Sequence, residues 1–330
     1  MTKIEAARRE YSDWSSAIGI RSMDDVNRII AEGNAIKLIN LCEARQERKY
    51  ADAADEVMWH SDRARIVMMS GPSSSGKTSS SLRIAQQCRV LGITPKVIEL
   101  DNYFVERDRT PLDENGNKDY EALEAMNIEL LGQNLNDLLS GKEIIVPKFD
   151  FVNGKTIFDE SRRMKLEKGD VLFMEGIHAL NPALTPSVDQ SRIFRIYISA
   201  LSALSTGDVH NSTTDKRLLR RIVRDNRTRG ISPEENILRW PSVRRGEIRN
   251  IFPYEENADV VFNSSLLYDL PLLKYYAEPL LYAIAESSPA YEKAHELTTF
   301  LTRITALQPA DIAAIPPTSI MREFIGGQTL

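Results

Sequence analysis

The pattern of apolar and polar positions along the chain changes near Arg65. Up to about residue 60, apolar residues recur at helical spacing, and Ser22 with Asp25 forms a capping-box-like helix start. Beyond this point, short apolar runs typical of buried parallel strands alternate with helical patterns. The predicted strands are 65–70, 96–100, 170–175, 192–199 and 258–263. Strands that alternate with helices indicate right-handed crossovers and a mainly parallel sheet, that is, an α/β fold.

The segment between the second and third predicted strands carries a helix near 124–140 and a β-hairpin that pairs 144–151 with 155–160. After the fifth strand the chain is predicted to be helical again, and it ends in a proline-containing tail from about 308 to 330. The most apolar tract, 266–285, contains three charged residues and two prolines. We therefore interpret this tract as a core-packed helix and not as a membrane span.

The stretch GPSSSGKTSSS, residues 71–81, follows the first predicted strand and opens a helix. Gly71, Gly76, Lys77 and Thr78 match the phosphate-loop pattern G-x-x-x-x-G-K-[ST]. The glycines permit the backbone angles that turn successive N–H groups inward, Lys77 adds a charge for the β- and γ-phosphates, and Thr78 supplies a hydroxyl for Mg²⁺. The alternative is a glycine–serine turn that binds nothing, which the flanking strand and helix disfavour. The expected phosphate-binding residues are Gly71, Ser73, Ser74, Ser75, Gly76, Lys77, Thr78 and Ser79.

Two carboxylates end predicted strands, at the edge where parallel sheets place their ligand crevice. Asp101 is placed to accept the proton of an acceptor hydroxyl, and the alternative is an N-cap aspartate that opens the next turn. Glu175 follows four apolar residues, the position from which a carboxylate holds Mg²⁺ through water. Because an unpaired charge at a buried strand end is costly, a purely structural role for Glu175 is disfavoured.

An arginine-rich helix is predicted over 216–230, KRLLRRIVRDNRTRG. Arg217, Arg220, Arg221 and Arg224 are expected on one face, with an apolar face opposite. This face has three candidate uses: a lid that grips phosphates, a solvated basic surface, and nucleic-acid binding. The excess of arginine over lysine favours bidentate contact with phosphate oxygens, and the nearby acids argue against nucleic acid.

Composition narrows the choice of partners and compartment. The formal net charge of −5 argues against a protein that coats nucleic acid or an anionic membrane. Cys42 and Cys88 are the only cysteines, which indicates a reducing compartment, and neither they nor the scattered histidines have zinc-like spacing. The N-terminus lacks the apolar region of a signal peptide, so we expect a cytoplasmic protein. The sequence leaves the oligomeric state open, a homo-oligomer included.

A phosphate loop serves switches and motors as well as phosphotransferases. Guanine-binding switches carry an N-K-x-D element, and residues 117–120, Asn-Lys-Asp-Tyr, fail at its last position. Asp101 and Glu175 instead supply the base and the metal-side carboxylate that a phosphotransferase needs. The sequence therefore favours phosphoryl transfer.

Separated motifs resemble, in order and spacing, the uridine kinase and phosphoribulokinase family: GPSSSGKT, DNYF, PKFDFVNGKT, VLFMEGIHAL, RLLRRIVRDNRTRG and NADVVF. The resemblance covers about 65–265 and is nearest to a uridine kinase-related subgroup whose longer members carry a synthetase-like N-terminal region. It implies a P-loop NTPase fold of the NMP-kinase type, with a small β-hairpin substrate insertion and an Arg-rich lid. The implied organisation is a helical N-terminal extension (1–60), a kinase domain (61–288) and a C-terminal helical tail (289–330).

The resemblance also implies roles for single residues. Asp101 matches the family's catalytic aspartate, and Lys77 is the second residue expected to be catalytic. Glu121 falls where uridine kinases place an aspartate that holds the ribose hydroxyls. The implied metal residues are Thr78, Glu175 and Asp101, the lid arginines that hold the triphosphate of ATP are Arg221, Arg224 and Arg229, and the substrate-binding residues are Phe104, Glu121, Phe149 and Asp150.

The departures from the family concern the base of the substrate. Uridine kinases carry a Y-D-F element followed by a histidine, whereas this chain has Phe149-Asp150-Phe151 and Gly154 at those positions. The tyrosine hydroxyl and the imidazole are both missing, so pyrimidine specificity does not carry over with the kinase chemistry. Phe149 is expected either to stack on a flat base or to pack in the core of the hairpin.

The leading expectation is a kinase that uses ATP and Mg²⁺ to phosphorylate a small ribose-containing molecule, with a nucleoside 5′-hydroxyl as the first choice of acceptor. Kinase action on another metabolite, such as a sugar phosphate, is the nearest alternative. A non-catalytic ATP-binding regulatory module is the second alternative. Asp101 and Glu175 together disfavour such a module, because binding alone does not need a base.

Overall fold

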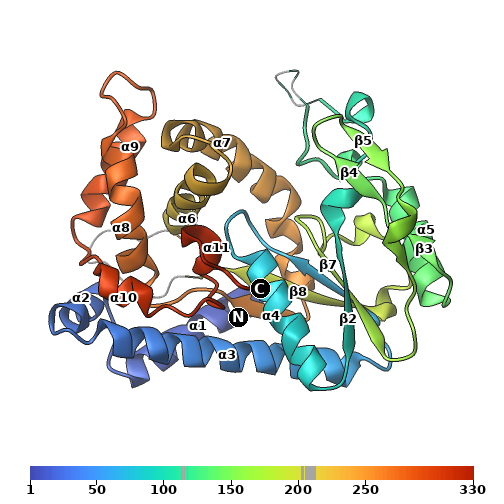
Figure 1. The fold of residues 1–330 in the computed structure, drawn as a ribbon, viewed down its shortest axis with the longest axis horizontal. Coiled ribbons are helices and arrows are strands. Elements are labelled where there is room, and N and C mark those ends of the chain that lie inside the picture. Colours follow the sequence, from blue (N-terminus) through green and yellow to red (C-terminus); the bar gives the residue numbers. More distant parts are fainter. Residues whose placement is uncertain (113, 115, 117, 202–203, 205–212) are drawn as a thin grey trace.

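The computed structural model describes residues 1–112, 114, 116, 118–201, 204 and 213–330. Within these residues the central sheet has five strands in the order β2-β7-β1-β8-β9, and all neighbouring strands are parallel. The strands are β1 (Ile66–Ser70), β2 (Thr94–Glu99), β7 (Asp170–Glu175), β8 (Ile193–Ser199) and β9 (Val260–Asn263). This arrangement confirms the predicted α/β fold with a mainly parallel sheet and flanking helices (Figure 1).

The second strand lies earlier in the chain than the sequence predicts. β2 ends at Glu99, so Asp101 lies in a 3₁₀ turn, η1 (Leu100–Tyr103), that follows the strand. Pro95 lies within β2, which is tolerated because β2 is an edge strand of the sheet. The shift moves Asp101 beyond the sheet and towards the ligand side of its edge.

The inner strands β1, β7 and β8 are almost entirely buried because helices cover the sheet. β1 and β8 are buried at every position, which explains their continuous apolar runs. On one face, Val67 packs in a hydrophobic cluster with Tyr50 of α3 (Ala35–His60) and Ile84 of α4 (Lys77–Val90). The phosphate loop connects β1 to α4, so packing on both of these elements fixes its two ends.

The segment between β2 and β7 covers the second face of the sheet. Its helix α5 (Ile128–Leu139) packs against β1 and β7 in a separate hydrophobic cluster. Two antiparallel pairs follow: β3 (Ile144–Ile145) with β6 (Arg163–Met164), and β4 (Lys148–Asp150) with β5 (Lys155–Ile157). The structure thus contains the predicted hairpin as β4–β5 and adds a second pair, since Pro147 lacks an amide hydrogen and interrupts the run between β3 and β4.

The remaining helices share one hydrophobic core that joins the two ends of the chain. They are α1 (Lys3–Ala17), α2 (Met23–Ala31), α6 (Thr213–Thr228), α7 (Pro233–Asn250), α8 (Asp269–Tyr282), α9 (Tyr291–Leu301), α10 (Pro309–Ala313) and α11 (Arg322–Ile325). The helix start predicted at Ser22 is present, because the Asp25 carboxylate accepts a hydrogen bond from the Ser22 amide at 3.1 Å. No helix in the described residues is long and apolar enough to cross a membrane.

The C-terminal segment returns from α10 to the centre of the molecule. In Figure 1 this red segment lies beside α6 and near the first turn of α4, both far from it in sequence. The two chain ends therefore frame the element that carries the phosphate loop: α3 packs along α4, and α11 lies near its start.

Candidate functional site

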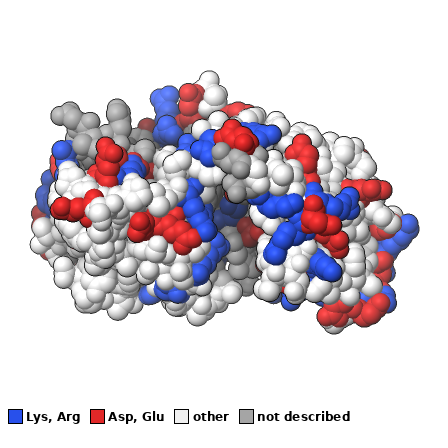
Figure 2. Space-filling view, turned by 90° about the horizontal axis from the view of Figure 1, so that it is seen from above, with Lys and Arg blue, Asp and Glu red and all other residues white. Residues whose placement is uncertain are grey.

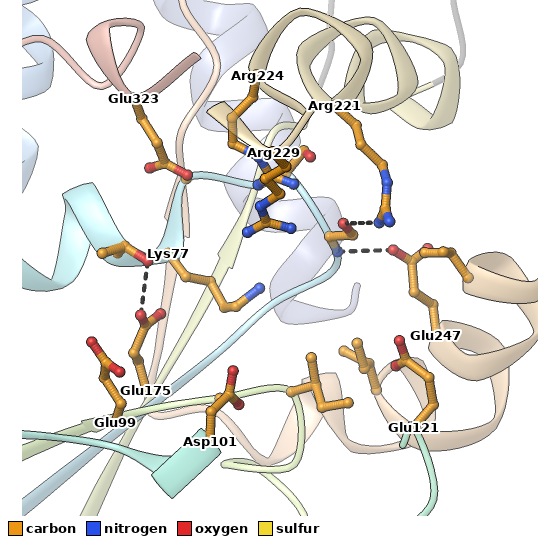
Figure 3. A pocket seen from close by; sticks show the side chains of 18 residues that line it. Lys77, Glu99, Asp101, Glu121, Glu175, Arg221, Arg224, Arg229, Glu247 and Glu323 are labelled. Atoms are coloured by element: carbon orange, nitrogen blue, oxygen red, sulfur yellow. Dashed lines mark hydrogen bonds between the residues drawn. The ribbon is translucent and has the colours of Figure 1, made fainter. Parts of the chain in front are cut away.

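A polar cavity of about 340 Å³ opens at the carboxyl ends of β1, β2 and β7. Its walls come from the phosphate loop, the ends of β2 and β7, helices α6 and α7, and the C-terminal segment (Figure 3). The lining residues are Ser73, Ser74, Gly76, Lys77, Thr78, Glu99, Asp101, Glu121, Glu175, Gly176, Ile177, Arg221, Arg224, Arg229, Val243, Glu247, Ile251 and Glu323. Seen from above, basic and acidic side chains are intermixed around a hollow in the middle of the molecule (Figure 2).

The phosphate loop has the backbone that its sequence predicts. Gly76 has φ +85°, and Ser74 has φ +58°, a left-handed conformation that non-glycine residues rarely adopt. A Cβ at Gly71 would lie 2.0 Å from the Ile198 carbonyl oxygen, so only glycine fits against β8 there. Lys77 folds back over its own loop, and its ammonium donates to the carbonyl of Gly71 at 2.9 Å.

The metal-side pair comes from two different elements. The Thr78 hydroxyl, on the first turn of α4, donates to Glu175 Oε1 at the end of β7 at 2.7 Å. Burial raises the pKa of Glu175, and the charge of Lys77 opposes that shift. A hydroxyl and a carboxylate are the hard oxygen donors that Mg²⁺ prefers, so the pair fits this ion. The described residues contain no cluster of three or more metal-ligating His, Cys, Asp or Glu side chains, so further ligands would come from phosphates and water.

Asp101 and Lys77 face the same cavity. Figure 3 shows the Asp101 carboxylate pointing into the cavity towards the Lys77 side chain. The N-cap of turn η1 is Glu99 and not Asp101, so the structure does not support the capping alternative. Burial raises the pKa of Asp101, and the positive charge of Lys77 counteracts this effect. A carboxylate with a raised pKa is a stronger proton acceptor when it is ionised.

The lid arginines converge on one buried carboxylate. Asp225, on α6, pairs with Arg224 at 2.8 Å, with Arg221 at 3.4 Å and with Arg229 at 3.6 Å. Arg221 also donates to the hydroxyl of Ser73 at 2.9 Å, which ties the helix to the phosphate loop. Asp225 therefore orients the three guanidinium groups that line this side of the cavity, and the sequence analysis did not single it out.

Arg217 and Arg220 correct the prediction of a single basic face on this helix. Both are buried, with exposed fractions of 1% and 0%. Arg217 forms an ion pair with Glu247 of α7, and Arg220 with Asp269 of α8. Their carboxylate partners lie 30 and 49 residues away in the sequence, which is why the helical pattern of α6 alone did not reveal the division.

Glu247 links this buried network to the cavity. Its Oε1 accepts the Ser73 amide hydrogen at 2.9 Å, and its two oxygens accept from both terminal nitrogens of Arg217, at 2.5 and 2.8 Å. Figure 3 shows the Glu121 side chain near that of Glu247, and a Cβ on the neighbouring Gly246 would be 3.1 Å from the Glu121 side chain. Burial raises the pKa of Glu121, and the negative charge of Glu247 raises it further. Glu247 was missed in the sequence because nothing marks it among the charged residues of α7.

Some predicted site residues lie outside the cavity lining. Phe149 is 3% exposed and packs with Phe104 and Phe151, at ring-centroid distances of 5.7 and 5.1 Å, as the hairpin-core alternative for this residue expects. The Asp150 carboxylate accepts from the Val152 amide at 2.9 Å and so stabilises the β4–β5 turn. The predicted substrate contacts of Phe104, Phe149 and Asp150 are therefore not part of this cavity.

Four further positions discussed above also lie outside the cavity lining: Gly154, Gly71, Ser75 and Ser79. Gly154 has φ +67°, and a Cβ there would lie 2.5 Å from the Arg107 Cβ, which explains why no larger residue stands at this position. Gly71 and Ser75 are buried positions of the phosphate loop and are not part of the cavity lining. Ser79 is also outside the lining, and its hydroxyl contacts Glu323 at 2.5 Å. Glu323 lines the cavity from the C-terminal segment and was likewise missed in the sequence.

Comparison with known proteins identifies a family for the greater part of this chain. Residues 66–270 match the profile of the Phosphoribulokinase / Uridine kinase family. The chain is 33% identical to the uridine kinase of Macrococcus caseolyticus (strain JCSC5402) over 199 residues, 59% of this chain and 86% of that protein. It is 33% identical to uridine-cytidine kinase C of Dictyostelium discoideum over 175 residues, 52% of this chain and 32% of that protein. A solved structure described as a possible uridine kinase from Bacillus stearothermophilus aligns with TM-score 0.40 and 20% identity over 64% of this chain and 98% of that chain.

Proposed function

Because the chain belongs to the phosphoribulokinase / uridine kinase family and is thus an ATP-dependent phosphotransferase that acts on a hydroxyl, we propose that it phosphorylates the 5′-hydroxyl of a nucleoside. The observation that carries the proposal is the shared cavity of Asp101, Lys77, the Thr78–Glu175 pair and the lid arginines. Phosphoryl transfer requires a base, ligands for a metal ion and a set of cations around one space.

The residues present divide into a donor side and an acceptor side. On the donor side, the phosphate loop, Lys77 and the lid arginines would hold the phosphates of ATP, and Thr78 with Glu175 would hold Mg²⁺. When bound, the metal ion supplies charge neutralisation for the phosphates. Asp101 orients the acceptor hydroxyl and takes its proton as the hydroxyl oxygen forms a bond to the γ-phosphorus. The bond from the γ-phosphorus to the bridging oxygen breaks, and ADP leaves with the electron pair.

The acceptor side favours a neutral sugar. Glu121 and Glu247 lie together at this end of the cavity, and the aliphatic side chains of Ile177, Val243 and Ile251 line it. The oxygens of Glu247 already accept from Ser73, Arg217 and Arg244. The Glu121 carboxylate is therefore the group that can accept hydrogen bonds from a diol and that repels a second phosphate group. This charge pattern supports a nucleoside over a sugar phosphate, and Glu121 is the residue we assign to the ribose hydroxyls.

The experiment is a screen of ADP release with MgATP and one acceptor at a time: nucleosides, sugar phosphates and pantothenate. We expect release to depend on a nucleoside and to be abolished in Asp101→Asn while ATP binding is retained. Release with a sugar phosphate alone would replace the proposed acceptor. Tight ATP binding with no acceptor-dependent release would instead identify a regulatory module, and unchanged turnover in Asp101→Asn would remove the assignment of the base.

A further inference from the structure

The C-terminal segment reaches the phosphate loop from outside the region that matches the family, which ends at residue 270. Ile320 packs against the loop so closely that a Cβ on Gly76 would be 2.3 Å from its Cδ1. Phe324 is fully buried, with the Arg220 guanidinium 5.0 Å above its ring. The segment is thus a packed part of the site and not a loose end.

Hydrogen bonds fix this segment at several points. Arg227 of α6 donates to the backbone carbonyls of Phe324 at 3.2 Å and Glu323 at 3.1 Å. The Ser319 hydroxyl donates to Glu43 of α3 at 2.7 Å, which ties the segment to the N-terminal helices. These anchors hold the backbone of residue 323 close to Ser79, so that a displacement of the carboxylate would be a rotation of the Glu323 side chain.

The Glu323 carboxylate occupies the donors of Ser79. Its Oε2 accepts from the Ser79 hydroxyl at 2.5 Å and lies 3.4 Å from the Ser79 amide nitrogen. Gly76 is the N-cap of α4, so Ser79 is the third residue of the helix and its amide is one of the free donors of the first turn. Such donors, at the positive end of a helix, are where a phosphate binds. Glu323 therefore contributes an internal anion at the start of the phosphate-loop helix.

We propose that Glu323 belongs to the phosphate-donor site and competes with the phosphates of ATP for Ser79, so that it sets the affinity for the donor. The inference rests on the proposed function, because it concerns the nucleotide that the loop binds. Glu323 also faces Lys77 across the cavity, as Figure 3 shows, so its charge adds to the carboxylates that a triphosphate meets on entry. A carboxylate and a phosphate oxygen repel each other at hydrogen-bonding distance, so ATP must displace the side chain from Ser79.

The test is the dissociation constant for MgATP, measured by calorimetry on wild type and on Glu323→Gln. The glutamine keeps the size of the side chain and removes its charge. We expect the Kd to fall about tenfold, equivalent to 1.4 kcal/mol. Glu323→Ala stands in if the glutamine variant does not fold. Glu292→Gln, an exposed position on α9 outside the cavity, is the matched control and should bind ATP as wild type does.

Each result of the Kd measurements either supports the competition between Glu323 and ATP or contradicts it. An unchanged or a higher Kd in Glu323→Gln would overturn the competition, and a higher Kd would make Glu323 a residue that helps to hold ATP. If wild type and both variants fail to bind ATP, the proposed function falls together with the inference. If Glu323→Gln binds more tightly but no acceptor promotes ADP release, the competition stands and the proposed transfer fails.

Discussion

The buried ion pair between Arg217 and Glu247 allows a quantitative test of how the lid helices support the phosphate loop. Arg217 makes a bidentate pair with Glu247, donates to the Ser73 carbonyl at 2.9 Å and lies 5.4 Å above the Trp240 ring. Ser73 is thus held through its carbonyl by Arg217 and through its amide by Glu247. The perturbation is Arg217→Met, which keeps much of the volume and removes the charge and the hydrogen bonds.

The expected loss of unfolding free energy depends on the partners that Glu247 keeps when Arg217 is replaced. In Arg217→Met, Glu247 stays buried with Arg244 as its remaining cationic partner, and the Arg244 side chain is 25% exposed. Breaking a buried pair by removal of one partner costs about 3–5 kcal/mol of unfolding free energy when the other charge is left uncompensated. Because Arg244 still pairs with Glu247, we expect a loss at the lower end of this range, about 3 kcal/mol. Arg244→Met removes a partly exposed partner and is expected to cost about 1 kcal/mol or less. Replacing both members of the pair, as Arg217→Met with Glu247→Leu, should recover most of the loss.

The assay is equilibrium unfolding in urea, followed by far-UV circular dichroism without nucleotide. The pH dependence of the unfolding free energy provides a second test. Burial alone would raise the pKa of Glu247, but the hydrogen bonds and charge of Arg217 outweigh it and hold the pKa below its ordinary value. The pair's stabilisation is therefore present above the pKa of the unfolded carboxyl and is lost as the pH falls through the folded pKa. Stability of Arg217→Met within 1 kcal/mol of wild type, or a double variant no more stable than the single one, would refute this reasoning.

Further predictions concern the chemistry and the hairpin. Lys77→Ala should lower kcat/KM by about 10²–10³-fold, the scale of one preorganised electrostatic contact, and retained kcat/KM in steady-state assays would exclude the role of Lys77. Because burial raises the pKa of Asp101, kcat/KM should rise with pH through a midpoint above the ordinary value of about 3.9, and a pH–rate profile with a lower midpoint on protein shown to be folded would contradict that shift. Phe149→Ala should lower the unfolding free energy by about 3–5 kcal/mol in urea titrations while the Kd for ATP is unchanged, and a weakened Kd would instead place Phe149 in nucleotide binding.

The parts of the fold that could be predicted are those in which neighbouring residues carry the information. The inner strands β1, β7 and β8 are mostly apolar runs because helices bury the sheet on both faces, and the run lengths match these strands to within a few residues. The phosphate loop could be identified for the same reason, because its glycines and Lys77 act within one short stretch of backbone. β2 was placed too late because Pro95 argues against a strand unless one knows that the strand lies at the sheet edge.

In helix α6, the burial of individual arginines could not be predicted from the sequence of the helix alone. Spacing alone places Arg217 and Arg221 one turn apart on the same side of the helix. It gives no information about the residues of other elements that pack against each arginine. The structure buries Arg217 because α7 brings Glu247 to it, and it leaves Arg221 at the cavity edge because Asp225 holds it from the same helix. The division between buried and cavity-facing arginines depends on Glu247 and Asp269, which the packing of α7 and α8 brings to α6, and such partners are found only once the helices have been placed.

The proposed acceptor end of the cavity could not be predicted from the sequence, because its residues also come together only in the tertiary fold. It is assembled from Glu121 in a loop, Ile177 after β7, and Val243 with Glu247 on α7, three segments that are separated from one another by dozens of residues. Donor recognition uses backbone amides of one loop, so it survives as a contiguous motif, whereas acceptor recognition uses side chains that meet only through the tertiary fold. The residues that would carry pyrimidine specificity by resemblance are the ones that the hairpin uses for its own packing, Phe149 inside its core and Gly154 against Arg107. Under the proposed function, we expect substitutions in the walls that α7 and Glu121 form, rather than in the hairpin, to change the acceptor that the chain uses.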